Sequence, residues 1–148
     1  MDTELYMYEA LRLAREAYDD CEVPVGCVIV DESGNMIGRG RNRRENSGLA
    51  TAHAEVEAIE EACRKKGGWR LDGCSLYVTL EPCPMCAGAI INSRISRVYY
   101  GAREPLSGSC GSVINLFMER YGHEPQIVGG VMGEECAELM RRFFREKR

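Results

Sequence analysis

The stretch CSLYVTLEPCPMCAGAIIN, residues 74–92, holds a strand, a sharp break and a helix in direct succession. Residues 74–80 are mostly apolar, which is typical of a short strand. A proline-containing break follows, and residues 85–92 have helical composition, with a proline suited to the first helical turn. Cys83 and Cys86 lie at this junction. The sequence therefore predicts a strand-to-helix turn that carries a C-x-x-C motif.

The chain on either side of this junction alternates between helical and strand-like segments. Periodicity and turn signals predict helices over 4–19, from His53 to 66 and from about 134 to 147, strands over 23–30, 36–40, 97–100 and 126–131, and a short helix after the Gly- and Ser-rich loop 101–112. Thr51 is an acceptable N-cap for the second helix. This order, without repeats or linkers, predicts one α/β domain over residues 1–148, with helices on both faces of a central mixed sheet.

Length and composition agree with this organisation, because 148 residues with 45% hydrophobic content suffice to bury one core. No apolar run approaches the roughly 20 residues that span a bilayer, and the N-terminus lacks the pattern of a secretory signal. We therefore expect no membrane association and a cytoplasmic location. There, the eight cysteines are better interpreted as reduced core residues plus a metal site than as a disulfide framework.

The net charge of −4 argues against broad, sequence-blind binding to nucleic acid, which normally requires a basic surface. Basic residues nevertheless gather in two clusters. Each cluster is interpreted either as a local positive patch or as solvated surface charge. The clusters are Arg39, Arg41, Arg43 and Arg44, and then Arg141, Arg142, Arg145, Lys147 and Arg148.

Three candidate metal ligands, His53, Cys83 and Cys86, are each expected at the start of a helix. The helix dipole and the free N–H groups favour thiolates there, so deprotonation for metal binding costs less. One His and two Cys would give zinc three protein ligands and leave the fourth tetrahedral position open for water, as in catalytic zinc sites. Glu55 lies two residues beyond His53, an offset that makes it a poor extra ligand. We expect it to take a proton from water and to deliver it to the leaving group.

A C-x-x-C motif alone is also compatible with a redox dithiol or with a structural zinc site. A structural site needs a fourth Cys or His, and the best candidates, Cys74 and Cys110, do not form a second paired motif. A redox dithiol explains neither His53 nor Glu55. The combination of motifs therefore favours hydrolytic chemistry, in which ammonia leaves a ring carbon that carries an exocyclic amine.

The pair H-x-E (residues 53–55) and P-C-x-x-C (residues 82–86) resembles the signature of cytidine and deoxycytidylate deaminase-like enzymes, a signature already described for zinc nucleobase deaminases. Segments along nearly the whole chain resemble, more narrowly, the bacterial tRNA adenosine deaminases. These segments are Glu22-Val23-Pro24-Val25-Gly26, residues 51–55, 77–89 and 93–95, Cys136-Ala137-Glu138-Leu139 and Phe143-Phe144-Arg145. The resemblance implies a three-layer α/β/α cytidine-deaminase-like fold with a central five-stranded mixed sheet.

The resemblance also implies an activity: hydrolytic deamination of adenosine to inosine at the wobble position of a tRNA anticodon. The target base would lie in a pocket over one zinc ion per subunit, with water attacking the purine carbon that bears the amine. Glu55 would shuttle the protons. The implied partners are the anticodon stem-loop of tRNA and, because the family is typically dimeric, a second copy of the chain.

Several further site residues are implied by position within the resembling segments. Asn42, eleven positions before His53, would hydrogen-bond the target base, although the bare sequence, with arginines beside it, favours an ordinary loop residue. The backbone amides of Ala54 and Cys83 would line the pocket, and Val25 would form part of its apolar wall.

The last helix carries two residues that match positions near the RNA. Phe144 would stack on a base and Arg145 would meet a phosphate. The alternatives are core packing for the neighbouring Phe143 and solvated charge for Arg145. The loop 101–108 departs from the family, which commonly has Asp at the position of Glu104 and often Lys at that of Leu106. Glu104 keeps an acceptor for a hydroxyl with longer reach, whereas Leu106 removes an expected phosphate contact.

Two other functions stay open at this point. A free purine base or nucleoside deaminase, such as a guanine deaminase, would keep the chemistry, and the acidic pI of about 5.3 together with Leu106 favours it. A non-catalytic, zinc-stabilised RNA-binding module would leave Glu55 without a role.

Overall fold

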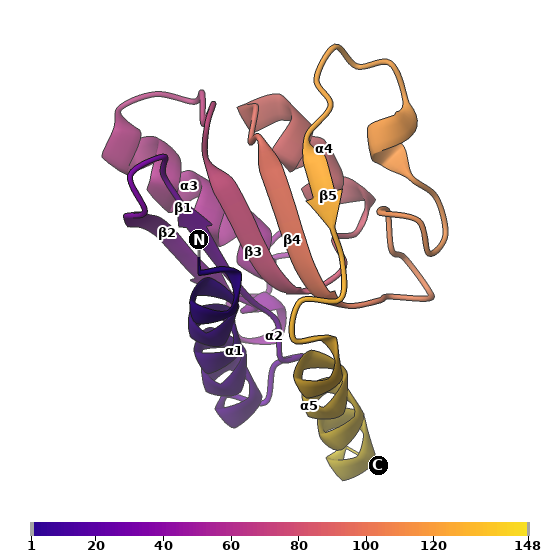
Figure 1. The fold of residues 1–148 in the computed structure, drawn as a ribbon. Helices are drawn as coiled ribbons and strands as arrows, with labels where there is room; N and C mark the ends of the chain where they lie inside the picture. Colours follow the sequence, from indigo (N-terminus) through magenta and orange to yellow (C-terminus); the bar gives the residue numbers. More distant parts are fainter. Residues whose placement is uncertain (1, 148) are drawn as a thin grey trace.

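The computed structural model describes residues 2–147 and arranges them around a five-stranded sheet (Figure 1). The strands are β1 (Gly26–Val30), β2 (Met36–Arg41), β3 (Ser75–Leu80), β4 (Arg97–Ala102) and β5 (Gln126–Val128). Their order in the sheet is β2-β1-β3-β4-β5. Strand β1 is antiparallel to β2 and β3, whereas β3, β4 and β5 run parallel, so the sheet is mixed, as predicted.

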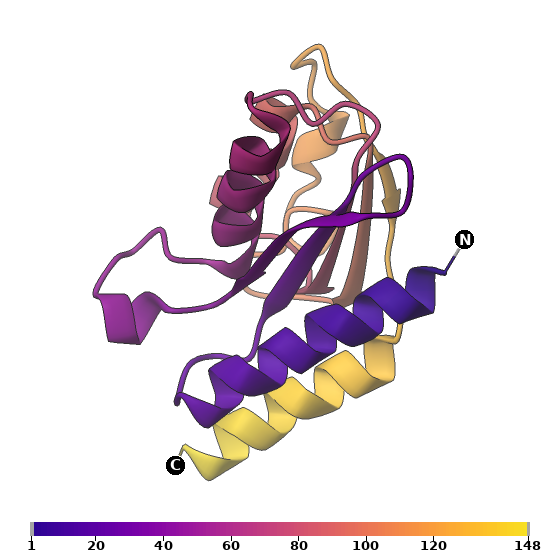
Figure 2. The same ribbon diagram turned by 90° about the vertical axis from the view of Figure 1, so that its left-hand side faces the viewer.

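Helices cover both faces of this sheet (Figures 1 and 2). Helices α1 (Thr3–Asp19) and α5 (Gly133–Glu146) lie side by side on one face, and α3 (Ala54–Lys66) and α4 (Pro84–Ser93) lie on the other. Successive strand side chains point to opposite faces and supply two separate cores. Ile29 and Leu76 pack toward α3 and α4, whereas Val28 and Tyr77 pack toward α1 and α5. The predicted three-layer α/β/α architecture is confirmed.

Three segments meet at the carboxyl end of β3. Helix α4 begins directly after this strand, and the first residue of the antiparallel β1 lies at the same end, where the Gly26 N–H donates to Thr79 Oγ1 at 3.2 Å. Helix α3 also starts here, because β2 brings a glycine against it. A Cβ on Gly40 would fall on the carbonyl oxygen of Ala54 and 2.8 Å from the Ala58 nitrogen. This close approach fixes the start of α3 beside the sheet.

Most predicted elements are present, with differences at their ends. The strand expected over 126–131 ends at Val128, since Gly129 packs against the Tyr100 ring and Gly130 has φ of +81°. The short helix after the loop is a 3-10 turn, η1 (Leu116–Met118). A four-residue helix, α2 (Arg44–Ser47), lies in the stretch 41–51 that has no helical periodicity.

The N-cap prediction was wrong for the second helix. The N-cap residue of α3 is His53, not Thr51, and no side chain caps the helix. The ring of His53 is turned toward two cysteines instead. The first turn of α3 therefore keeps free N–H groups beside these side chains.

All eight cysteines lie among the described residues, and none of them forms a disulfide, in agreement with the interpretation as reduced thiols. Within residues 2–147, none of the helices combines the length and the apolar character that crossing a bilayer requires.

Candidate active site

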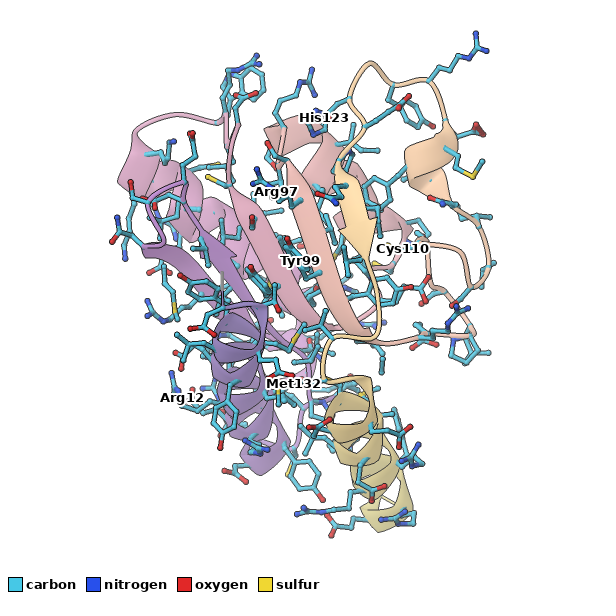
Figure 3. All side chains as sticks on the ribbon, in the orientation of Figure 1. Arg12, Arg97, Tyr99, Cys110, His123 and Met132 are labelled. Atoms are coloured by element: carbon cyan, nitrogen blue, oxygen red, sulfur yellow. The ribbon has the colours of Figure 1, made fainter. Side chains whose placement is uncertain are left out.

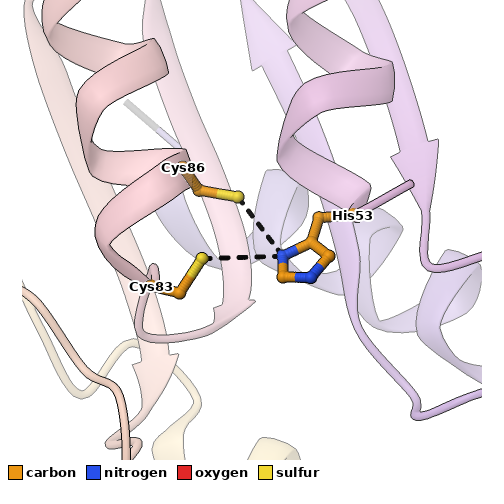
Figure 4. Close-up of side chains that lie close together, drawn as sticks. All are labelled: His53, Cys83 and Cys86. Atoms are coloured by element: carbon orange, nitrogen blue, oxygen red, sulfur yellow. Dashed lines mark hydrogen bonds between the residues drawn. The ribbon is translucent and has the colours of Figure 1, made fainter. Parts of the chain in front are cut away.

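His53, Cys83 and Cys86 come together between the first turns of α3 and α4 (Figure 4). His53 Nδ1 lies 3.6 Å from Cys83 Sγ and 3.5 Å from Cys86 Sγ, and the three ligand atoms lie within 4.8 Å of one another. Bond lengths of about 2.3 Å to sulfur and 2.0–2.1 Å to nitrogen in tetrahedral zinc imply about 3.6 Å between such atoms. The two measured N···S distances match this value, so the donor set fits zinc in type and in spacing.

The charges of this cluster suit a cation. The pKa of Cys83 is lowered to about 4, chiefly because the Cys86 thiol hydrogen-bonds its sulfur and His53 adds a second hydrogen bond. The pKa of Cys86 is raised, first by that same hydrogen bond and then by burial. The pKa of His53 is raised, because the Cys83 hydrogen bond and the charge of Glu55 outweigh burial and the positive charge of Arg44. The lowered pKa of Cys83 favours its thiolate, whereas the raised pKa values of Cys86 and His53 mean that metal binding would release their protons.

Glu55 lies beside this cluster, in the first turn of α3, with only 4% of its surface exposed. Burial raises the pKa of Glu55 to about 7, and the negative charge on Cys83 adds to this shift. A carboxyl group with a pKa near neutrality can both accept and return a proton under physiological conditions. The structure thus sets a carboxyl group with a pKa suited to proton transfer next to the three side chains that could hold a metal ion.

A cavity of about 240 Å³ opens over the cluster and over Glu55. Most of the residues expected from the sequence line it, which leaves only Arg145 and the fully buried Cys86 outside the lining. The lining consists of Val23, Val25, Asn42, Arg44, His53, Ala54, Glu55, Leu80, Glu81, Cys83, Glu104, Ser107, Met140 and Phe144. Ala54 is the first residue of α3, so its N–H has no intrahelical acceptor and remains free for a ligand.

Asn42 is 8% exposed and is held at both ends of its amide. Its Nδ2 donates to the carbonyl of Val23 at 3.2 Å, and its Oδ1 accepts from the N–H of Arg44, also at 3.2 Å. Each end of an amide side chain has one further hydrogen-bonding position. Asn42 is therefore fixed in orientation and can still bind a base, as the resemblance implies.

The residues expected on the last helix separate into three environments. Phe143 is buried at 5% exposure and packs edge-on against Tyr18, so its core-packing interpretation is confirmed. Phe144 is half exposed and lines the cavity. Arg145 lies in an adjoining groove of about 730 Å³, where it pairs with Glu138 at 3.3 Å. Of the C-terminal basic cluster, Arg148 lies outside the described residues.

The loop that departs from the family pattern forms one wall of both hollows. The Glu104 carboxylate accepts from the N–H of Leu106 at 2.9 Å and lines the cavity. Leu106 is 89% exposed and lines the groove. The longer Glu104 side chain therefore also braces its own loop.

Sequence reasoning assigned no role to Glu81, which is 2% exposed and lines the cavity two residues before Cys83. Its carboxylate accepts from the N–H groups of Glu104, Cys110 and Ser112 at 3.0, 2.8 and 3.1 Å and from the Ser112 hydroxyl. Cys110 is labelled in Figure 3, in the loop beyond β4. The available signal in the sequence was an acidic residue, Glu81, directly before the P-C-x-x-C motif. Its hydrogen-bond partners lie 23 to 31 residues further along the chain and could not be inferred.

The first basic cluster is mostly neutralised by ion pairs. Arg39 pairs with Glu9, Arg41 with Asp20 and Arg43 with Glu57. Arg44 is exposed and forms no ion pair among residues 2–147, and it lines the cavity. The sequence showed the cluster but not which of its members faces the site.

Comparison with known families matches residues 1–102 to the cytidine and deoxycytidylate deaminase zinc-binding region. That match includes every member of the cluster in Figure 4 and Glu55. The chain belongs to the cytidine and deoxycytidylate deaminase family. Membership confirms both the resemblance and the zinc cofactor that the motifs predicted.

Individual relatives of this deaminase cover nearly its whole length. A tRNA-specific adenosine deaminase of Bacillus subtilis (strain 168) is 49% identical over 146 residues, which span 98% of this chain and 90% of the relative. A solved structure from studies of A-to-I editing by tRNA:A34 deaminases has a TM-score of 0.86 at 44% identity, covering 90% of this chain and 97% of the other. A guanine deaminase structure from Bacillus subtilis has a TM-score of 0.67 at 38% identity, covering 84% and 79%.

Proposed function

We propose that this chain catalyses the hydrolytic deamination of adenosine to inosine at the wobble position of a tRNA anticodon. The observation that carries the proposal is the cavity, whose lining includes Glu55, His53 and Cys83, with the buried Cys86 completing the metal-ligand cluster beside them. The similarity to a tRNA-specific adenosine deaminase over almost the full chain supports the choice of substrate.

His53, Cys83 and Cys86 would hold the zinc ion. When bound, zinc with three protein ligands lowers the pKa of a water molecule in its fourth position and so supplies a nucleophile at neutral pH. In the net reaction one water is consumed and one ammonia is released: a C–O bond forms at the purine carbon that bears the amine, and its C–N bond breaks.

The other residues would orient the base and move protons. The Glu55 carboxylate takes a proton from the water and returns it to the departing nitrogen. Asn42 and the free N–H of Ala54 offer hydrogen bonds to the base, and Val25 supplies an apolar contact. The half-exposed ring of Phe144, at the junction of cavity and groove, would stack on a base, and Arg145 in the groove would meet a phosphate.

The direct test is incubation of the purified zinc protein with an anticodon stem-loop that has adenosine at the wobble position. We expect stoichiometric inosine and ammonia, measured by mass spectrometry of the digested RNA. A parallel panel of free guanine, adenine and their nucleosides tests the second candidate, which the guanine deaminase structure favours. If a free purine releases ammonia while the adenosine in the RNA stays intact, the protein is a free purine deaminase and not a tRNA deaminase. If the protein binds RNA but turns over none of the substrates, the non-catalytic RNA-binding module is supported.

The remaining expectations concern assembly and place. We propose that the whole chain forms one catalytic domain and that two copies associate, for which exposed apolar side chains between β4 and β5 offer a surface: Val113, Ile114, Met118 and Tyr121. Light scattering of the eluting protein would show a mass near 33 kDa, twice the chain mass of 16.6 kDa, for the dimer. A tRNA substrate also supports the cytoplasm as the place of action.

A further inference from the structure

Arg44 has a position that the proposed chemistry does not use. It lies on α2 at the cavity, and it is the sole Arg or Lys among the described residues that line this space. Three carboxyl groups, those of Glu55, Glu81 and Glu104, line the same cavity. An anionic ligand that approached this acidic lining would therefore meet one compensating charge.

The guanidinium of Arg44 is available to such a ligand. Its neighbour Arg43 pairs with Glu57 at 2.6 Å, but Arg44 has no ion pair within residues 2–147. The side chain is exposed, so an anion can reach it without first breaking an ion pair within the protein. Arginine presents planar donors that match phosphate geometry, often with two parallel hydrogen bonds.

The backbone that carries Arg44 is anchored on both sides. Its N–H donates to Asn42 Oδ1 at 3.2 Å, which ties it to the residue expected to bind the base. The next two N–H groups, of Glu45 and Asn46, donate to the carboxylate of Glu22 at 3.0 and 2.7 Å. Glu22 is 1% exposed, so this turn is fastened to a buried charge. A four-residue helix on the surface thus has a defined place at the cavity.

The size of the cavity limits which part of a bound nucleotide can lie beside Arg44. At about 240 Å³ it is smaller than the ~300–1,000 Å³ typical of pockets for drug-sized ligands. We expect a base to occupy this volume, with the sugar and its phosphates extending toward solvent, where the exposed side chain of Arg44 can reach them.

We propose that Arg44 binds a backbone phosphate next to the target nucleotide and thereby selects a nucleotide within a strand over a free base or nucleoside. This inference rests on the proposed function. It assigns a specificity-determining contact to Arg44 on α2, in addition to the phosphate contact that the resemblance implies for Arg145 on α5.

The test pairs protein variants with RNA in which one phosphate is neutral. The probe is an anticodon stem-loop with a methylphosphonate either 5′ or 3′ of the wobble adenosine, and the variants are Arg44→Ala, Arg44→Lys and the ion-paired control Arg43→Ala. Dissociation constants are measured on a Glu55→Gln background, so that the RNA stays intact, and kcat/KM is measured with Glu55 present. Zinc content and the thermal midpoint verify that each variant is folded.

We expect Arg44→Ala to weaken binding to normal RNA on the order of tenfold and to lower the salt slope of log K by about 0.7, the value for one phosphate contact on a single strand. Arg44→Lys should recover part of this loss, and Arg43→Ala should change binding less than twofold. At one of the two methylphosphonate positions, wild type should lose the same factor and Arg44→Ala should lose nothing more.

Additive losses at both methylphosphonates, or equal losses in Arg43→Ala and Arg44→Ala, would overturn the assignment. Failure of the proposed function is distinguishable, since wild type would then make no inosine in normal RNA. If the wild-type protein edits RNA and Arg44→Ala binds and edits it equally well, this inference is refuted and the proposed function stands.

Discussion

The carboxylate of Glu81 accepts a hydrogen bond of 2.8 Å from the backbone N–H of Cys110, 29 residues further along the chain. This bond fastens the loop after β4 to the segment that leads into Cys83. A buried anion that receives several N–H groups replaces most of the hydration it loses. The cavity wall and the metal-ligand turn therefore depend on one side chain.

Glu81→Gln should loosen this wall, because the amide presents N–H donors to the N–H groups of the loop. We expect the free energy of unfolding to fall by about 1–3 kcal/mol, the cost of leaving buried hydrogen-bonding groups unmatched. KM for RNA should rise more than kcat falls, while zinc stays bound. Urea denaturation and steady-state kinetics measure both effects, with exposed Glu119→Gln as a control expected to stay within about 0.5 kcal/mol.

Gly40→Ala should disturb the site from β2, the edge strand that packs against α3. The added Cβ would fall on the carbonyl of Ala54 at the start of α3, so the helix must shift or the strand must bend. Overpacking of this kind costs about 1–3 kcal/mol and would move His53 and Glu55 together. Gly88→Ala is the matched control. It lies inside α4 with open space around it, so alanine should stabilise the fold by up to about 1 kcal/mol. Equal effects of the two substitutions in calorimetry would contradict the close packing of β2 on α3.

The sequence predicted the metal-ligand cluster because its signals are local. Cys83 and Cys86 follow a strand and begin a helix, and His53 stands where helical composition begins, so strand and helix patterns alone set these residues at element ends. Because all three candidate ligands were predicted at helix starts, one shared metal site was the simplest arrangement.

Other features depend on contacts between distant segments and left no local pattern. Helix α2 has too few residues for periodicity, and it is fixed by Glu22, which lies 23 and 24 residues before its partners. The bonds of Glu81 to the loop have the same origin. The sequence predicted Thr51 as the N-cap of α3, because Thr is a favourable capping residue, but the helix begins after His53. N-cap preferences describe side chains that are free to cap the helix, whereas the His53 ring faces two cysteines.

Glu9 provides a test of pH dependence away from the site. Its pKa is lowered, first by the hydrogen bond from Arg12, labelled in Figure 3, and further by Arg39 of β2, although burial opposes the shift. A lowered folded-state pKa adds stability above the unfolded value of about 4.3, and this contribution is lost as pH falls through the folded value. Glu9→Gln should thus destabilise the protein by about 0.5–1 kcal/mol at pH 7 and by almost nothing below the folded pKa. Urea titrations at several pH values, with exposed Glu60→Gln as control, should show this convergence, and a pH-independent difference would refute it.

Zinc binding should depend on His53, Cys83 and Cys86 and not on the other cysteine thiols. The protein should contain one zinc per chain by elemental analysis, and chelation should abolish inosine formation until zinc is restored. Removal of a ligand, as in Cys86→Ala, should weaken zinc binding by more than the roughly 10–100-fold seen for residues that only support ligands. Cys63→Ala, at a half-buried thiol beside Trp69, should keep full zinc occupancy.

Glu55→Gln separates proton transfer from metal binding. The amide keeps the size of the side chain but cannot accept and return a proton, so kcat should fall by about 10²–10⁴, the usual contribution of general acid–base catalysis. Zinc content should be unchanged, because the ligand atoms belong to His53, Cys83 and Cys86. Glu55→Asp should recover part of the rate, since it restores the carboxylate with a shorter reach. Single-turnover measurements at saturating enzyme isolate the chemical step, and turnover of Glu55→Gln within tenfold of wild type would remove this residue from proton transfer.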